Sequence, residues 1–477
     1  MADHSIARPV MGEGEARRLF DVQHQASRRG PPADAKLRRD RLERLRAVVA
    51  GNQAAFARAI SDDFGIRSRT ETELLEIVPT VSAIRHARRQ VGRWMRPERR
   101  RVDPLFQPAA AWVRFEPLGV IGIISPWNYP LQLAVSPLVD ALAAGNRAMV
   151  KPSELTPAFS ELLRRAVAER FDEAEIGIVT GGVEVGQAFA GLPFDHLLFT
   201  GSTAVGRKVY QAAAANLVPV TLELGGKSPV VICPDYDLAR AARSVAFGKF
   251  VNAGQTCIAP DYVLVPQGRE GEFAEAVMAQ VRRSYPTIAG NDDYSGLISE
   301  RHQRRLADAI EAARAAGATV LSHEDEGARA QGKIGPTILL DAPAGSLFLT
   351  EEIFGPVLPI LPYRDLDSAI ALIAAGERPL ALYCFSNRRR YRERVLDGAI
   401  SGGVTLNGTL LHVAQENLPF GGVGASGIGA YHGREGFKRF SHARAVHRIG
   451  FVNVFERLGP PWGRMAKALG RRLAKRR

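Results

Sequence analysis

Cys257 is the residue of this chain whose type and surroundings best fit nucleophilic chemistry. It lies in NAGQTCIAP (252–260), where its neighbours are small or polar, with a glycine upstream and a proline downstream. The other two cysteines, Cys233 in PVVICP and Cys384 in LALYCFS, belong to apolar runs, where a cysteine usually behaves as a small buried hydrophobic residue. The thiolate is the reactive form of cysteine, so the stretch predicts a nucleophile in a mobile, polar loop.

Two further polar side chains stand at the ends of apolar runs. Glu223 in LELGGKSP (222–229) is either a paired structural charge or a base whose pKa is set by its environment. Asn128 in SPWNYP (125–130) follows an apolar strand, and its amide either stabilises an oxyanion or supports a turn. For each motif alone the structural interpretation is favoured.

A glycine-containing turn, FTGSTAVGRK (199–208), ends one predicted strand and opens a helix. Gly201 and Gly206 let the backbone approach a ligand closely, and the N–H groups around Ser202 at the helix start suit a phosphate. The spacing differs from the G-x-G-x-x-G of ordinary dinucleotide-binding folds, and a plain strand–turn–helix is the alternative.

VKPSELTP (150–157) ends the preceding predicted strand in a similar way. Ligands of doubly wound sheets bind at the carboxyl ends of strands, where Lys151 and Glu154 could hold the hydroxyls of a nucleotide ribose. Helix capping by Ser153 and Thr156 explains the same residues about equally well.

The elements that must position these side chains form an alternating series. Residues 14–60 predict amphipathic helices, and from about residue 119 short apolar runs alternate with helical segments. A second series runs from PVVICP to GGVTLNG (402–408). Continuous apolar strands alternating with helices indicate parallel sheets covered on both faces. We therefore predict an α/β protein with two doubly wound parallel-sheet domains.

Composition excludes several classes of protein. With 46% hydrophobic and 24% charged residues the chain is typical of soluble globular proteins. Its three scattered cysteines give neither a disulfide framework nor a zinc site of the usual spacing, and the amino terminus lacks the apolar core of a signal peptide, so we expect a reducing, cytoplasmic location and no metal. The apolar stretch 118–145 contains three prolines and an aspartate, so we expect no membrane span.

The net charge of +13 is concentrated in two places. Residues 85–101 carry eight arginines, and the last fourteen residues carry seven basic side chains and no acidic one. Such clusters could bind nucleic acid or an anionic membrane. No nucleic-acid motif accompanies them, so we expect no specific nucleic-acid partner. The amphipathic tail has a thin apolar face, and we expect it to stay in solution.

Taken together and in this order, the motifs resemble those of the aldehyde dehydrogenase superfamily, from about residue 20 to 450. The resemblance is strongest to its class 3 branch and, through RWMRPERRRV and NGTLLHVAQENLPFGG, to bacterial coniferyl aldehyde dehydrogenases. The motifs that carry it are PWNYP, KPSE, FTGSTAVG, LELGGKSP, GQTC, EEIFGPV (351–357) and PFGGVGASG (419–427).

The resemblance implies roles for individual residues. Cys257 matches the nucleophile, Glu223 the general base and Asn128 the oxyanion donor. The cofactor is then NAD, with NADP possible, and no metal is needed. The implied cofactor-binding residues are Lys151 and Glu154 at the adenosine ribose, Gly201, Ser202 and Gly206 at the pyrophosphate, Glu352 at the nicotinamide ribose, and Phe354 beside the ring.

The family fold also implies a domain layout and a homodimer held by a small β extension. The expected divisions are a dinucleotide-binding domain at 1–101 and 118–224, a catalytic domain at 225–430, oligomerisation strands at 102–117 and 440–450, and a basic tail at 451–477.

The implied function is the NAD(P)-dependent oxidation of an aldehyde to its acid through a cysteine thiohemiacetal and thioester. The aldehyde is expected to be aromatic or phenylpropenyl, such as coniferyl aldehyde. The alternatives are a dehydrogenase of medium- or long-chain aliphatic aldehydes, a relative that transfers the acyl group to CoA, and a catalytically silent structural or nucleic-acid-binding relative. Glu223 argues against acyl transfer to CoA, because a carboxylate favours activation of water.

Overall fold

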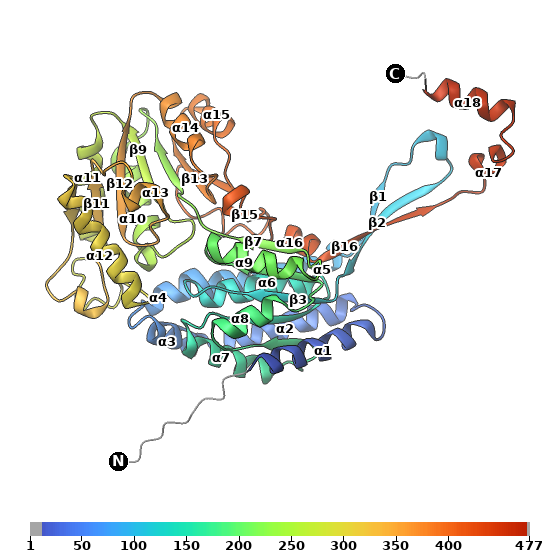
Figure 1. Ribbon diagram of the computed structural model, residues 1–477, viewed down its shortest axis with the longest axis horizontal. Coiled ribbons are helices and arrows are strands. Elements are labelled where there is room, and N and C mark those ends of the chain that lie inside the picture. Colours follow the sequence, from blue (N-terminus) through green and yellow to red (C-terminus); the bar gives the residue numbers. More distant parts are fainter. Residues whose placement is uncertain (1–11, 475–477) are drawn as a thin grey trace, which may run out of the picture.

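Two large sheets lie side by side in the computed structural model, which describes residues 12–474 (Figure 1). A narrow three-stranded arm projects from one of them and carries the last two helices at its far end. Both large sheets are layered between helices, so the predicted α/β class with two doubly wound sheets is confirmed. Within residues 12–474 no helix is both long and apolar enough to cross a bilayer.

The first sheet has six strands in the order β15-β7-β6-β3-β4-β5. All neighbours are parallel except the short edge strand β15, which the sequence did not predict and which pairs antiparallel with β7. Its strands are β3 (Val120–Ile124), β4 (Arg147–Lys151), β5 (Ile176–Ile178), β6 (His196–Thr200), β7 (Val220–Glu223) and β15 (Gly427–Ile428).

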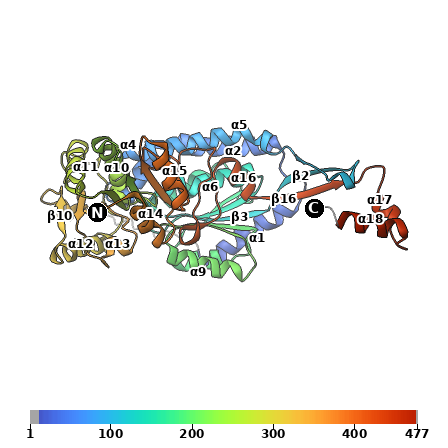
Figure 2. The same cartoon turned by 90° about the horizontal axis from the view of Figure 1, so that it is seen from above.

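Helices cover both faces of this sheet, as Figure 2 shows for α5 and α6 on one side and α1 and α9 on the other. The alternation of side chains explains why: Val120 packs into the cluster with α1, α8 and α9, whereas Ile121 packs into the cluster with α2, α5 and α6. These helices are α1 (Glu13–Arg28), α2 (Ala35–Gly51), α3 (Gln53–Asp63), α4 (Arg69–Thr72), the π-helical turn η1 (Glu73–Ile77), α5 (Val78–Trp94), α6 (Pro130–Ala143), α7 (Pro157–Ala168), α8 (Val183–Ala190), α9 (Thr203–Ala214) and α16 (Gly433–Arg439).

The second sheet has seven strands in the order β10-β11-β12-β9-β8-β13-β14, antiparallel only at β10. Its strands are β8 (Pro229–Ile232), β9 (Tyr262–Pro266), β10 (Thr319–Ser322), β11 (Thr337–Leu340), β12 (Val357–Tyr363), β13 (Ala381–Phe385) and β14 (Gly403–Leu406). The surrounding helices are α10 (Leu238–Phe250), α11 (Glu270–Ser284), α12 (Glu300–Ala315), α13 (Leu347–Thr350), α14 (Leu366–Ala375) and α15 (Arg389–Gly398), with the short 3-10 turns η3 (Val251–Gly254), η4 (Arg329–Gln331) and η5 (Gly424–Ser426).

The arm consists of β1 (Glu98–Arg100), β2 (Ala110–Pro117) and β16 (Ser441–Arg448), all antiparallel. The sheet therefore begins at Glu98, before the extension expected at 102–117, and the residues between β1 and β2 include the 3-10 turn η2 (Pro104–Phe106). Helices α17 (Val454–Leu458) and α18 (Arg464–Ala474) follow β16.

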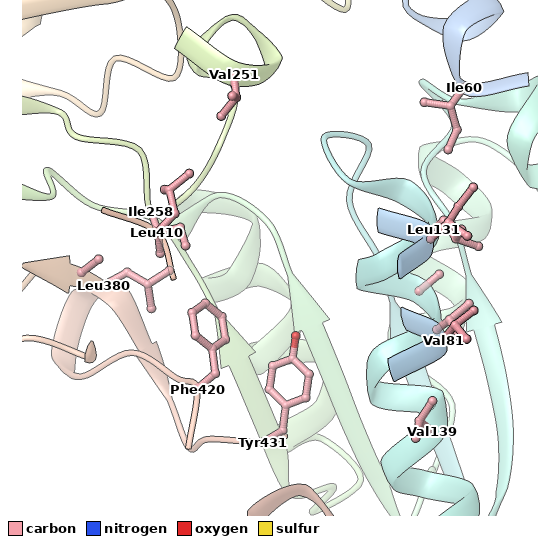
Figure 3. Packing of buried hydrophobic residues seen from close by; sticks show 14 of the residues in the cluster. Ile60, Val81, Leu131, Val139, Val251, Ile258, Leu380, Leu410, Phe420 and Tyr431 are labelled. Atoms are coloured by element: carbon pink, nitrogen blue, oxygen red, sulfur yellow. The ribbon is translucent and has the colours of Figure 1, made fainter. Parts of the chain in front are cut away.

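One continuous apolar cluster joins the two large sheets. Figure 3 shows Leu131 and Val139 of α6 on one side, and Ile258, Phe420 and Tyr431 on the other. Because these residues belong to the same buried cluster, the two halves share a core, and the loops at the ends of their strands are held in a fixed relation.

Candidate active site

The loop that carries Cys257 follows η3 and has an unusual backbone. Asn252 and Ala253 adopt left-handed conformations with φ of 51° and 49°, which non-glycine residues rarely adopt. Gly254 has φ of 74°, and a Cβ there would collide with the carbonyl of Gly355. Residues 252–256 are all buried, which differs from the mobile, polar loop predicted from the sequence. Such strained backbone persists only where the surrounding structure holds it.

Hydrogen bonds tie this loop to the loop of Asn128. Asn128 Nδ2 donates to the Gln255 carbonyl at 3.1 Å, and Asn252 Nδ2 donates to the Asn128 carbonyl at 2.9 Å. Gln255 Nε2 donates in turn to the carbonyls of Asn252 and Gly296, both at 3.0 Å. The amide of Asn128 is therefore held against Gln255, which stands two residues before Cys257 in the chain.

A buried ion pair also holds the Asn128 loop in place. Arg67 Nη1 donates to Glu76 Oε1 at 2.7 Å and to the Asn128 carbonyl at 3.3 Å. The other oxygen of Glu76 accepts from the backbone N–H groups of Leu131 and Gln132 at the start of α6. Neither charged side chain is accessible to solvent. No sequence motif indicated this pair, because the Asn128 loop that it supports lies 61 residues beyond Arg67 in the chain.

We expect Arg67→Met to lower the melting temperature strongly, since it leaves Glu76 buried without its counter-charge. Breaking a buried pair in this way typically costs about 3–5 kcal/mol. Thermal unfolding measures the effect, and Arg69→Met is the matched control, because Arg69 is exposed and exposed substitutions usually change stability by no more than about 0.5 kcal/mol. Equal melting temperatures for the two variants would contradict this prediction.

Glu223 ends β7 and is almost fully buried. Burial raises the pKa of its carboxyl well above the usual value, and the charge of Arg439 offsets this only in part. Neither carboxyl oxygen has a hydrogen-bond partner. A buried carboxyl without partners is costly unless it serves a ligand or a reaction, so Glu223 has the properties of a base with an altered pKa.

The thiol of Cys257 is neutral in this environment. Burial raises its pKa to about 12, and the carboxyls of Glu352 and Glu223 act in the same direction. The N–H groups of Cys257 and Ile258 favour the thiolate but do not outweigh these effects. Attack by this thiol therefore requires a nearby proton acceptor.

A cavity of about 310 Å³ brings the predicted residues together. Cys257, Glu223 and Asn128 face it from three different loops and strand ends. The predicted cofactor residues Gly201, Ser202, Glu352 and Phe354 also line it, and so do residues to which the sequence analysis gave no role: Trp127, Thr200, Gly225, His302 and Arg305.

Glu352 and Phe354 are held firmly at this cavity. Burial raises the pKa of Glu352 to about 8, with a further contribution from Asp261. The Phe354 backbone has φ of 50°, and its carbonyl accepts a hydrogen bond from His302 Nε2 at 2.7 Å. The indole of Trp127 lies edge-on to the Phe354 ring, with centroids 5.4 Å apart. These contacts give the ring one orientation.

The other predicted cofactor residues lie outside this cavity or have structural contacts as well. Lys151 Nζ donates to Glu154 Oε2 at 2.9 Å at the end of β4, so the two are already paired. Ser202 caps α9 by accepting from the Val205 N–H at 3.4 Å. Gly206 packs inside α9, where a Cβ would lie 2.6 Å from the Leu224 side chain, so it allows close helix–strand packing.

These residues fit a dinucleotide. The N-terminal turn of α9 opens beside Ser202 at the cavity, where free N–H groups suit a phosphate. Thr200 Oγ1 and both oxygens of Glu223 are buried without partners. Within residues 12–474 no cluster of three or more His, Cys, Asp or Glu side chains could hold a metal ion.

A partly buried cysteine and a partnerless carboxyl that face one cavity, beside a helix N-terminus suited to a phosphate, are typical of a thiol-dependent oxidoreductase. The profile of the Aldehyde dehydrogenase family matches residues 9–446. The chain belongs to that family and is an NAD(P)-dependent enzyme that oxidises aldehydes. The resemblance found in the sequence is thereby confirmed.

Two curated relatives illustrate the similarity. The chain is 47% identical to a probable coniferyl aldehyde dehydrogenase of Caulobacter vibrioides, over 93% of this chain and 94% of that protein. It is 41% identical to the 4,4'-diaponeurosporen-aldehyde dehydrogenase of Staphylococcus aureus, over 86% of this chain and 89% of that protein.

Solved structures agree. AldH of Staphylococcus aureus in its substrate-bound state superposes with a TM-score of 0.90 at 36% identity, covering 95% of this chain and 98% of that one. An aldehyde dehydrogenase of Mycobacterium tuberculosis complexed with NAD+ gives a TM-score of 0.83 at 30% identity, covering 93% and 92%.

Proposed function

We propose that Cys257 is the nucleophile, Glu223 the general base and Asn128 the oxyanion donor of aldehyde oxidation. The observation that supports this assignment is their placement on one cavity of about 310 Å³. Three chain segments that are distant in sequence converge there, and the network around Asn252 and Gln255 fixes two of them.

The first step is attack of the Cys257 sulfur on the aldehyde carbon. Because burial raises the pKa of the thiol to about 12, its proton passes to a neighbouring carboxyl as the C–S bond forms. Glu223 is suited to accept it, since its own pKa is raised. The carbonyl oxygen becomes an oxyanion, stabilised by the second N–H of the Asn128 amide, whose first N–H is bound to Gln255.

Lys151, Glu154, Ser202, Glu352 and Phe354 hold the cofactor in this proposal. Bound there, NAD(P) would supply the hydride acceptor, so that loss of hydride from the hemithioacetal carbon would leave a thioester on Cys257. Phe354 and Trp127 fix one wall of the cavity, so the residues around the reacting carbon need not rearrange.

Hydrolysis of the thioester completes the cycle. Glu223, having released its first proton, takes a second one from a water molecule that attacks the thioester carbon. Its buried oxygens have no competing hydrogen-bond donor, so they are available to that water. The carboxylic acid leaves, and Cys257 regains its proton.

We propose an aromatic or phenylpropenyl aldehyde, such as coniferyl aldehyde, as substrate. The name of the Caulobacter relative supports this choice. The test is to measure kcat/KM for benzaldehyde, cinnamaldehyde and coniferyl aldehyde and to compare these values with those for medium- and long-chain saturated aliphatic aldehydes. A preference of about tenfold or more for the phenylpropenyl aldehydes is expected, and a preference for the aliphatic series would establish the alternative.

A homodimer in the cytoplasm, with its dinucleotide-binding domain built on the six-stranded sheet, is part of the same proposal. The arm of β1, β2 and β16 offers exposed strand edges for pairing with a second copy. All three cysteines are free thiols, which suits a reducing compartment. Sedimentation of the purified protein tests the dimer.

The carboxylate of Glu154 is expected to affect the choice between NAD and NADP. Although burial raises it, the hydrogen bond and charge of Lys151 leave the pKa of Glu154 below its usual value, so the carboxylate is charged at neutral pH. The 2′-phosphate of NADP would face this charge, at a cost of about 1 kcal/mol for a solvated pair. Glu154→Gln is therefore expected to shift the NAD-to-NADP ratio of kcat/KM toward NADP by about fivefold.

Glu169→Gln is the matched control, since this exposed glutamate follows the neighbouring helix α7 and leaves the ribose residues unchanged. An unaltered ratio in Glu154→Gln would mean that Glu154 only neutralises Lys151 and does not contact the ribose.

A further inference from the structure

The last described segment of the chain lies apart from both large sheets. Helices α17 and α18 stand at the far end of the arm, away from the cavity (Figures 1 and 2). The segment is attached to the arm by a stacked pair of rings, Phe106 and Phe455, whose centroids are 5.2 Å apart. Neither helix contains a buried residue. Aldehyde oxidation as proposed uses none of these residues.

The two helices together form an apolar surface wider than the sequence suggested. α18 contributes Met465, Leu469 and Leu473, which recur every four residues on one face. A groove of about 220 Å³ lies between Leu469 and Leu473 and the apolar side chains of the preceding segment, which are Phe455, Leu458 and Trp462. Trp462 is 58% exposed and Met465 is 74% exposed. The structure thus adds a second row of apolar side chains to the thin face expected from α18 alone.

Positive charge surrounds this apolar surface. Arg464 and Arg471 lie on the side of α18 away from Leu469, Lys467 borders the groove, and Arg472 lies at the edge of the apolar face, close to Met465. Across residues 12–474 no acidic group forms an ion pair with any of these four side chains. The chain from residue 464 to its end contains no aspartate or glutamate.

We propose that this segment, residues 449–474, binds the surface of a bilayer that contains anionic phospholipid. Amphipathic helices with basic polar faces lie in the interface with their apolar side among the acyl chains, and tryptophan prefers the headgroup level. Anionic headgroups attract lysine and arginine near the surface. A bilayer offers both the apolar and the anionic partner that the two faces of α18 require.

Two other occupants match the surface less well. The phosphate backbone of a nucleic acid would pair with the arginines but would leave the apolar groove exposed. A second copy of the segment, docked groove to groove about a two-fold axis, would bring the two Lys467 side chains that line the groove toward each other.

Flotation with phospholipid vesicles tests the proposal on the full-length protein at physiological salt. We expect the protein to float with vesicles of phosphatidylcholine and phosphatidylglycerol and to stay in solution with phosphatidylcholine alone. The variant Arg471→Gln/Arg472→Gln is expected to lower the partition coefficient about tenfold or more. The matched control is Arg282→Gln/Arg283→Gln at the exposed end of α11, which removes the same charge and is expected to bind like the parent.

Two further measurements separate the apolar contribution. Leu469→Ser/Leu473→Ser is expected to weaken flotation by at least about tenfold while turnover of a small aldehyde stays normal, which shows that the body remains folded. Tryptophan emission should shift to the blue on addition of anionic vesicles, and Trp462→Phe should remove most of that shift.

Each alternative outcome overturns the proposal. Equal flotation with neutral and anionic vesicles would refute the need for anionic lipid. Absence of flotation, combined with retention of duplex DNA that depends on Arg471 and Arg472, would assign the surface to nucleic acid. Absence of flotation, combined with a change of oligomeric state in the Leu469→Ser/Leu473→Ser variant, would assign it to a second copy of the chain.

Discussion

Cys257→Ala is expected to reduce aldehyde oxidation by at least about 10⁴-fold while leaving NAD binding nearly unchanged. In the proposed mechanism the sulfur of Cys257 bonds to the substrate, whereas we expect the cofactor to be held mainly by residues at the end of β4, at the start of α9 and in the loop of Glu352 and Phe354. NADH formation with a saturating aldehyde measures the first effect, and quenching of protein fluorescence by NAD measures the second.

The other two cysteines provide the matched controls. Cys233 follows β8 and Cys384 lies in β13, and both are buried in the apolar cluster between that sheet and α14 and α15. Cys233→Ala and Cys384→Ala are expected to remain active within a few-fold of the parent, with some loss of stability from the small cavities created. Turnover by Cys257→Ala close to that of these controls would refute covalent catalysis.

Glu223→Gln is expected to have the second largest effect and to separate the two halves of the reaction. The substitution keeps the size of the side chain but removes the proton acceptor, so kcat should fall by about 10²–10⁴-fold. A thioester on Cys257 should accumulate and add the mass of the acyl group to the intact protein, which mass spectrometry detects. Because Glu223 also accepts the thiol proton in the proposed first step, the thioester should form more slowly in this variant but still outlive that of the parent.

The dependence of the turnover rate on pH provides a further test of the role of Glu223. Burial raises the pKa of Glu223, so the base becomes deprotonated at a higher pH than an ordinary glutamate does. Turnover by the parent should therefore rise with pH, and turnover by Glu223→Gln should lose that dependence.

Glu175→Gln is the control for that profile, because Glu175 is paired with Arg41 and Arg44 outside the cavity. It is expected to change stability and to leave the shape of the profile as in the parent. A profile of Glu223→Gln that still rises as in the parent would remove Glu223 from the role of base.

The sequence predicted correctly that several candidate site residues stand at the ends of parallel strands. Glu223 ends β7, Lys151 ends β4, and Ser202 and Asn128 follow β6 and β3. Apolar strands are readily recognised, and the carboxyl ends of parallel strands share one edge, so the position of these residues follows from local pattern. The placement of Cys257 beside them follows from the family resemblance.

Other features depend on contacts between distant segments and left no local pattern. Arg67, which precedes α4, and Glu76, in η1, support the Asn128 loop from a distant segment of the chain. Cys257 packs against the apolar cluster that joins the two large sheets. Its burial there raises the pKa of its thiol. Polar residues in NAGQTC suggested exposure, but their side chains are used for hydrogen bonds inside the protein.

The antiparallel pairing of β16 with β2 has a consequence for synthesis on the ribosome. Arg444 and Arg114 are direct neighbours across these strands although 330 positions (444 − 114) separate them in the chain. Strand β15 likewise joins the edge of the first sheet beside Glu223 from near the end of the chain. Nascent chains must therefore keep an unfinished sheet edge unpaired until almost the last residues emerge. During that interval the edge is exposed to aggregation, and chaperone demand should be set by translation speed over residues 230–440.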